Sequence, residues 1–263
     1  MGVIFDFWYS QLFLSLPYPT KSLQDQTIII TGSNTGLGFE AAKHCVRLNA
    51  AKVILTVRDL TKGDAAKAAI YAAHPVRTTV IEVWHLDLLS TNSVKEFAAK
   101  AAGLERLDAV IENAAMINPF WVEVEGFEST ILANVINTEL LALLLLPKLQ
   151  ETAIRWNVQP RLSIVVSESH FVAKFEERTR SDIFEALSQE TGANMDDRFK
   201  TLGGVFRAGT VRKNQQVIKT DSCRQLFDSR SLPNRHSSES YRLEEMVYDF
   251  GDSGNGKNRG SRQ

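Results

Sequence analysis

From Thr27 onward the sequence alternates short β-branched runs with longer segments of helical pattern, and this alternation limits the possible folds more than any other feature. Strands are expected at 27–30, 52–57, 79–84, 108–112 and 162–167. Helices are expected between them, at 37–48, 60–73, 91–103 and 129–149. Strands that alternate with helices are typical of right-handed βαβ units around a parallel sheet. We therefore predict an α/β fold with a doubly wound parallel sheet, incomplete after the fifth strand.

The first strand leads through the glycine-rich stretch TGSNTGLG, residues 31–38, directly into a helix. Gly32 permits a tight turn, Gly36 lets backbone N–H groups approach a pyrophosphate, and Gly38 allows close packing of the helix. The helix N-terminus adds a partial positive charge. The stretch predicts a Rossmann-type phosphate site, although a glycine-rich turn without a ligand stays open. The expected cofactor-binding residues here are Gly32, Ser33, Asn34, Gly36, Leu37 and Gly38.

The end of the second strand indicates which dinucleotide is bound. NAD-specific sites place an acid there for the ribose 2′-hydroxyl, but this chain has Val57, followed by Arg58 and, nearby, Lys62. Two cations without an acid suit a 2′-phosphate, which arginine can bind in bidentate fashion. Asp59 is better placed to cap the following helix. We predict NADP(H) as the cofactor, with Arg58 and Lys62 as binding residues; an ordinary pair of surface cations is the alternative.

The composition divides the chain into three parts. Residues 1–26 open with an aromatic, apolar arm that is too short for an ordinary membrane span and is expected to pack on the domain, with peripheral membrane contact as the alternative. Residues 27–203 form the predicted dinucleotide-binding domain. Residues 204–263 contain only 16 hydrophobic residues, so we expect them to be largely disordered.

Charge and cysteine content bound the partners and the compartment. The net charge of −1 gives no reason to expect nucleic acid as a partner. Two cysteines, Cys45 and Cys223, form no disulfide framework, which favours a reducing, cytoplasmic location. No metal site is expected, and the oligomeric state stays open. The Leu-rich run that ends at Pro147 is apolar nearly all round, and we expect a buried helix that is too short to span a bilayer.

Five stretches in order, TGSNTGLG, HLDL (85–88), ENAA (112–115), Asn134 in the long helix and IVVSESH (164–170), resemble the short-chain dehydrogenase/reductase family. The opening PYPTKS and the later SDIFEAL and MDDRF are similar to fungal members, many of them from secondary-metabolite pathways. The resemblance covers roughly residues 15–203. It implies hydride transfer between NADP(H) and a small-molecule carbonyl or alcohol.

The resemblance also implies roles for individual residues. Asp87 would touch the adenine ring, and Asn113 would lie along the cofactor ribose. Asn134 would hold a water relay, and Ser167 would bind the substrate oxygen, so these two are the expected catalytic residues. Each has a structural alternative: Asp87 as the cap of the helix that opens at Thr91, Asn134 bonded to backbone, and Ser167 as a strand-end hydroxyl.

The family's catalytic tyrosine and lysine, four residues apart, align here with Phe199 and Gly203. Phenylalanine has no proton to donate, and glycine has no cation to lower a tyrosine pKa. None of the five tyrosines is followed four residues later by lysine. Three readings stay open: an impaired NADP(H)-dependent reductase, a non-catalytic NADP-binding protein, and a truncated or mis-spliced fragment. The substrate is not identified by the sequence.

Overall fold

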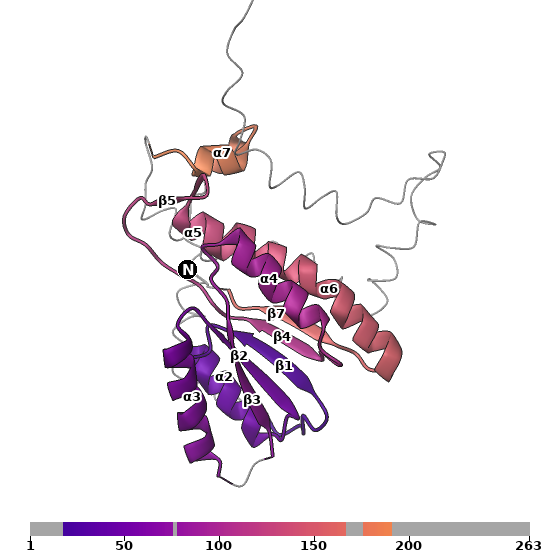
Figure 1. Cartoon of the computed structure of the whole chain (residues 1–263). Coiled ribbons are helices and arrows are strands. Elements are labelled where there is room, and N and C mark those ends of the chain that lie inside the picture. The colour runs from indigo at the N-terminus through magenta and orange to yellow at the C-terminus, as the bar shows by residue number, and fades with distance from the viewer. Residues whose placement is uncertain (1–17, 76–77, 167–175, 191–263) are drawn as a thin grey trace, which may run out of the picture.

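The computed structural model describes residues 18–75, 78–166 and 176–190. Its centre is a parallel sheet of five strands in the order β3-β2-β1-β4-β7 (Figure 1). The predicted doubly wound α/β fold is confirmed, since the chain winds from β1 outward to β3 and then returns to β4 on the other side of β1. The strand bounds are β1 (Thr27–Thr31), β2 (Lys52–Val57), β3 (Val80–His85), β4 (Ala109–Glu112) and β7 (Arg161–Ile164).

Helices cover both faces of the sheet, α2 and α3 on one and α4 and α6 on the other (Figure 1). Successive side chains of β1 point to opposite faces. Ile28 and Ile30 therefore pack against the first pair of helices, and Ile29 packs against the second. All three are buried, which is why the strand is a continuous apolar run. The helix bounds are α2 (Gly36–Arg47), α3 (Leu60–Ala73), α4 (Thr91–Ala102) and α6 (Asn137–Trp156).

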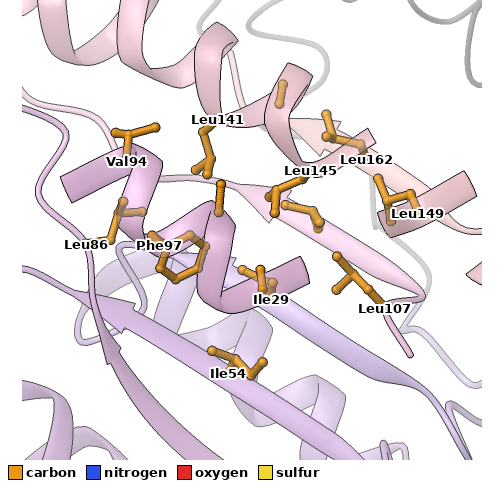
Figure 2. Packing of buried hydrophobic residues seen from close by; sticks show 14 of the residues in the cluster. Ile29, Ile54, Leu86, Val94, Phe97, Leu107, Leu141, Leu145, Leu149 and Leu162 are labelled. Carbon is orange, nitrogen blue, oxygen red and sulfur yellow. The ribbon is translucent and has the colours of Figure 1, made fainter. Parts of the chain in front are cut away.

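The larger apolar cluster fills the space between the sheet and the α4–α6 layer. Figure 2 shows Phe97 of α4 and Leu141 and Leu145 of α6 pointing toward Ile29 and Ile54 of the central strands. Complete burial of one such side chain stabilises the fold by about 1.5–3 kcal/mol. This cluster fixes α6 against the sheet, and α6 in turn reaches the strand ends.

The helix predicted at 129–149 is longer in the structure, where it extends from Ser129 to Trp156. Three segments follow one another, α5 (Ser129–Ile131), the π-helical η1 (Leu132–Ile136) and α6, which continues through Pro147 to Trp156. At 28 residues, Ser129–Trp156 is long and apolar enough to cross a membrane, so the length argument from the sequence was wrong. However, 67% of its most apolar window is buried inside the domain, which is typical of a core helix.

Three small elements were not predicted. A hairpin joins β5 (Glu123–Val124) to β6 (Phe127–Glu128), and its turn holds Glu125 and Gly126 at positive φ. After β7 come the short η3 (Glu176–Thr179) and α7 (Ile183–Leu187), where Leu187 packs on Ile131 and Val135. Elements of two to five residues carry no readable hydrophobic period.

Of the three predicted parts of the chain, the structure describes much of the middle one, only the end of the N-terminal arm, and none of residues 204–263. Of the arm, only 18–26 is described; there the ring of Tyr18 meets His44 edge-on at 4.9 Å, and Arg47 donates to the carbonyl of Pro19 at 2.5 Å. Residues 18 and 19 therefore contact α2, and the packing of the rest of the arm stays a prediction. Residues 1–17 and the predicted disordered region 204–263 fall outside the description, so the domain boundaries stay predictions.

Candidate dinucleotide site

A cleft of about 210 Å³ opens at the carboxyl ends of the strands, beside the point where the strand order reverses between β1 and β4. In open α/β sheets this is the position at which ligands bind. Four of the predicted cofactor residues line it: Gly32, Asn34, Arg58 and Asp87. The remaining lining residues are Thr56, Val57, Leu86, Leu88, Leu89, Ala114, Ala115, Met116 and Ala133.

The glycine-rich turn has the geometry that the sequence requires of it. Gly32 and Gly36 have φ values of 64° and 59°, in the left-handed region that side chains avoid. Gly38 is needed for a different reason: a Cβ there would lie 2.4 Å from the carbonyl oxygen of Gly32 and 2.6 Å from Nδ2 of Asn113. The first turn of α2 therefore rests directly on the loop that faces the cleft.

The N-terminus of α2 differs from those of the neighbouring helices. Its N-cap, Thr35, makes no side-chain capping bond. By contrast, the side chains of Asp59, Ser90 and Glu128 cap α3, α4 and α5. The α2 terminus thus leaves its N–H groups to an external acceptor, and Leu37 in this first turn is 75% exposed.

Hydroxyl groups anchor the turn from beneath. Oγ of Ser33 accepts from the backbone N–H of Thr56 at 3.0 Å and is fully buried, so this predicted cofactor residue uses its side chain to hold the loop on β2. Oγ1 of Thr31 accepts from the N–H groups of Asn113 and Ala114 at 2.9 and 2.8 Å. Sequence reasoning gave Thr31 no role, although it directly precedes the glycine turn.

Arg58 extends from the tip of β2, where it is exposed and lines the cleft. Val57, at the position of the NAD-type acid, is buried. Oδ1 of Asp59 accepts from the N–H groups of Thr61 and Lys62, which confirms its expected capping of α3. Lys62 is exposed in the first turn of that helix and does not line the cleft. The two predicted cations are therefore not equivalent.

Asp87 lies on the cleft wall beside the end of β3. Its Oδ1 accepts from the N–H of Leu89 at 2.9 Å, and its own N–H donates to Oγ of Ser93. The cap of α4 is Ser90, so the alternative of Asp87 as the helix cap is wrong. Its predicted contact with adenine stays a prediction.

Asn113 turns toward the glycine loop. Its Nδ2 donates to the carbonyls of Thr31 and Gly32 at 3.1 and 3.3 Å. Because Asn113 does not line the cleft, the side chain holds the loop from β4, and its predicted position along the ribose stays a prediction.

Asn134 lies in the π-helical turn and is buried. Its Oδ1 accepts from the N–H of Met116 at 2.8 Å, and its Nδ2 donates to the carbonyl of Met116 at 2.7 Å. This matches the structural alternative of an asparagine bonded to backbone. The other expected catalytic residue, Ser167, lies outside the described residues, as do Phe199 and Gly203. Within 18–75, 78–166 and 176–190, no cluster of three or more His, Cys, Asp or Glu could hold a metal.

Asn137 is a further residue at this site that sequence reasoning missed. It follows Asn134 by three residues, is fully buried, and donates from Nδ2 to the carbonyl of Leu88 at 2.9 Å. A second asparagine at helical spacing in an otherwise apolar run was the signal that could have found it.

The parallel sheet with a glycine-rich strand-to-helix turn at its switch point defines a Rossmann-type dinucleotide-binding fold. A family model described as "short chain dehydrogenase" matches residues 26–154. The chain is 38% identical over 204 residues to the short chain dehydrogenase sol3 of Alternaria solani, covering 76% of this chain and 71% of that protein. The chain belongs to the short-chain dehydrogenase family.

Two further similarities are found, one in sequence and one in fold. It is 48% identical over 196 residues to the short chain dehydrogenase atnD of Emericella nidulans, covering 74% of this chain; the chain spans 62% of that relative's length. A short-chain dehydrogenase from Sphingobium yanoikuyae, solved in complex with NADPH, has a TM-score of 0.55 at 18% identity over 75% of this chain and 67% of its own. The last comparison concerns the fold.

Proposed function

We propose that the chain binds NADP(H) in the cleft at the strand ends, as a dehydrogenase/reductase of carbonyl or alcohol substrates whose proton transfer is impaired. The choice of NADP(H) as the cofactor rests on Arg58, which lies at the tip of β2 in the same cleft as Gly32 and Asn34. Val57, at the position where an NAD-type acid would stand, is buried. A protein of the same fold was solved with NADPH, so the fold admits this dinucleotide.

The residues present fit such a ligand. The pyrophosphate would meet the uncapped N-terminus of α2 and the glycine turn. The guanidinium of Arg58 would pair with the 2′-phosphate, a contact that is charge-assisted and bidentate. Asp87 lines the β3 side of the cleft, where the adenosine would lie, while Ala115 and Met116 line the β4 side. When bound, the dinucleotide would supply a hydride.

The proposed reaction differs from that of the family in its proton donor. Reduction of a carbonyl needs a proton on the oxygen as well as a hydride on the carbon, and general acid catalysis contributes typically 10²–10⁴-fold. Phe199 has no ionisable proton, and Gly203 offers no cation. Ser167 can hold the substrate oxygen by a hydrogen bond, but a serine hydroxyl is a weak acid. We therefore expect slow turnover, with water as the proton source.

The test is a pair of fluorescence titrations, NADPH and NADH, followed by NADPH consumption over a panel of ketones and aldehydes. NADPH should bind at least about tenfold more tightly than NADH, the effect of a single charge-assisted contact. Turnover should be slow but above the protein-free rate. Equal binding of the two dinucleotides, or no binding of either, would contradict the cofactor proposal.

A second candidate function follows from the same substitutions. If Phe199 and Gly203 abolish chemistry entirely, the chain is a non-catalytic NADP(H)-binding protein. The titrations would then succeed while the consumption assay stays at the protein-free rate over the whole panel. The relatives' fungal origin fits a role in secondary metabolism, and substrates from such pathways belong in the panel.

A further inference from the structure

Asn137 connects the buried helix to the β3 side of the cleft. Its Nδ2 donates to the carbonyl of Leu88 at 2.9 Å. Leu88 follows Asp87 and, with Leu89, forms the wall of the cleft beyond β3. Because Asn137 is fully buried and its helix is packed on the sheet, this bond ties a loop to a rigid part of the core.

The same side chain is fixed from a second direction. The hydroxyl of Thr91, at the start of α4, lies 3.1 Å from Oδ1 of Asn137 and 2.5 Å from Oε2 of Glu125. Both carboxylate oxygens of Glu125 also accept from the N–H of Thr91 at 3.2 Å. The β5–β6 turn, the start of α4 and the buried helix therefore meet at one point, directly behind the Leu88 loop.

Asn134 and Asn137 each form hydrogen bonds to one side of the cleft. Asn134 holds the backbone of Met116 on the β4 side, and Asn137, three residues later, holds Leu88 on the β3 side. Both Met116 and Leu88 line the cleft. Two amides on one helix thus fix the opposite walls, and each acts through backbone groups of the wall it holds.

We propose that Asn137 is a positioning residue for the adenosine half of the dinucleotide. It rests on the NADP(H) binding proposed above. By holding the Leu88 carbonyl, Asn137 sets the backbone that carries the Asp87 carboxylate, which lines the same cleft as Arg58. Without the amide, the loop keeps its sequence but loses its fixed position, and a ligand must then order the loop on binding.

The test compares Asn137→Leu with Thr152→Ala. Leucine has the same number and branching of side-chain heavy atoms as asparagine, but its two methyl groups are bulkier and form no hydrogen bonds. Thr152 is also buried on α6, where its Oγ1 accepts from the N–H of Leu107, far from the cleft lining. Both variants lose a buried polar contact from one helix, so both should be less stable, and only the first should change binding.

The probes are 2′,5′-ADP, which carries the adenosine half alone, and NADPH, each measured by calorimetry. Asn137→Leu should weaken both by the same factor, about tenfold, or ~1.4 kcal/mol, while Thr152→Ala leaves both within about twofold of wild type. Unchanged 2′,5′-ADP binding in Asn137→Leu, a loss confined to NADPH, or an equal loss in Thr152→Ala would each overturn the inference.

Two further outcomes are distinguishable. If wild-type protein binds neither probe, the proposed function fails, and the inference fails with it. If Asn137→Leu does not fold, Glu125→Ala tests the same network from an exposed side chain. Its 2′,5′-ADP affinity should fall by about threefold, which in free energy is about half of the tenfold loss expected for Asn137→Leu, and an unchanged affinity would overturn the inference.

Discussion

Asn134 bonds both backbone groups of Met116, accepting from its N–H at 2.8 Å and donating to its carbonyl at 2.7 Å. A buried side-chain amide thereby bonds the backbone of Met116, four residues beyond the end of β4. The contact joins the π-helical turn of the long helix to the loop on the β4 side of the cleft. Its loss should therefore be measurable as a loss of stability.

Asn134→Asp should lower the free energy of unfolding by about 2 kcal/mol, because the carboxylate has no donor for the Met116 carbonyl and is itself buried. Urea denaturation at neutral pH measures this. Asn92→Asp makes the same chemical change at an exposed position in the first turn of α4 and should stay within about 0.5 kcal/mol of wild type. Equal losses in the two variants would contradict the role of the Met116 contact.

Arg58→Ala should weaken NADPH by about 10–100-fold and leave NADH nearly unchanged, since a charge-assisted contact contributes about 1.5–3 kcal/mol and NADH has no 2′-phosphate. Fluorescence titration of both dinucleotides checks the difference. Arg155→Ala removes an exposed cation from the far end of α6 and serves as the control. A similar loss of affinity for both dinucleotides in Arg58→Ala would mean that the guanidinium does not bind the 2′-phosphate.

Gly38→Ala should abolish dinucleotide binding and lower the melting temperature, because the new Cβ would lie 2.4 Å from the Gly32 carbonyl and 2.6 Å from the Asn113 amide. Neither neighbour can retreat without displacing the glycine turn. Gly103→Ala is the matched control, since its Cβ would meet only the Lys100 carbonyl at 3.4 Å. Normal NADPH binding in Gly38→Ala would show that the turn tolerates displacement.

Cys45 should resist alkylation until the protein unfolds. Burial raises the pKa of its thiol from 9.0 to about 11, and the reactive thiolate is correspondingly scarce at pH 8. Iodoacetamide labelling followed by mass spectrometry, in a Cys223→Ser background, should proceed at least about tenfold more slowly than in urea. Rapid labelling of the folded protein would contradict the burial of this thiol.

The same pKa shift has a consequence for stability at high pH. Because the folded-state pKa lies above the unfolded one, the contribution is fully present below pH 9.0 and is lost as the pH rises toward about 11. Cys45→Ala should remove this part of the alkaline decline while creating a small cavity. An identical decline between pH 9 and 11 in both proteins would assign it to other groups.

Phe199→Tyr combined with Gly203→Lys should raise NADPH-dependent ketone reduction by up to about 10²-fold, the lower range for general acid catalysis. The pair restores an ionisable proton and a cation four residues away. Phe206→Tyr with Gly203→Lys adds the same groups at a different spacing and should have no effect. No gain from the first pair would mean that the missing dyad is not the only obstacle to turnover.

The strands, the longer helices and the family could be predicted because each depends on residues close together in the chain. The helix expected at 60–73 matches α3, and Asp59 caps it as expected, since a cap and its acceptors are two or three residues apart. The hairpin at 123–128 and the continuation of the long helix to Trp156 carried no such local pattern.

The candidate site was predictable in part for the same reason. Gly32, Asn34, Arg58 and Asp87 lie at strand ends that a parallel sheet brings to one edge, and all four line the cleft. The sequence could not assign the side chains that hold this edge together. Ser33 anchors a loop to β2, and Asn113 turns toward the glycine turn.

The sequence by itself determined the βα alternation, the glycine turn and the absence of an acid at Val57, the last residue of β2, because hydrophobic period and backbone conformation are local properties. Only the tertiary structure decided which polar groups meet. Asn137 reaches Leu88 across 49 residues and Asn134 reaches Met116 across 18, and neither partner is a side chain. A backbone carbonyl is present at every position, so only the packing of the helix on the sheet selects which one is bound.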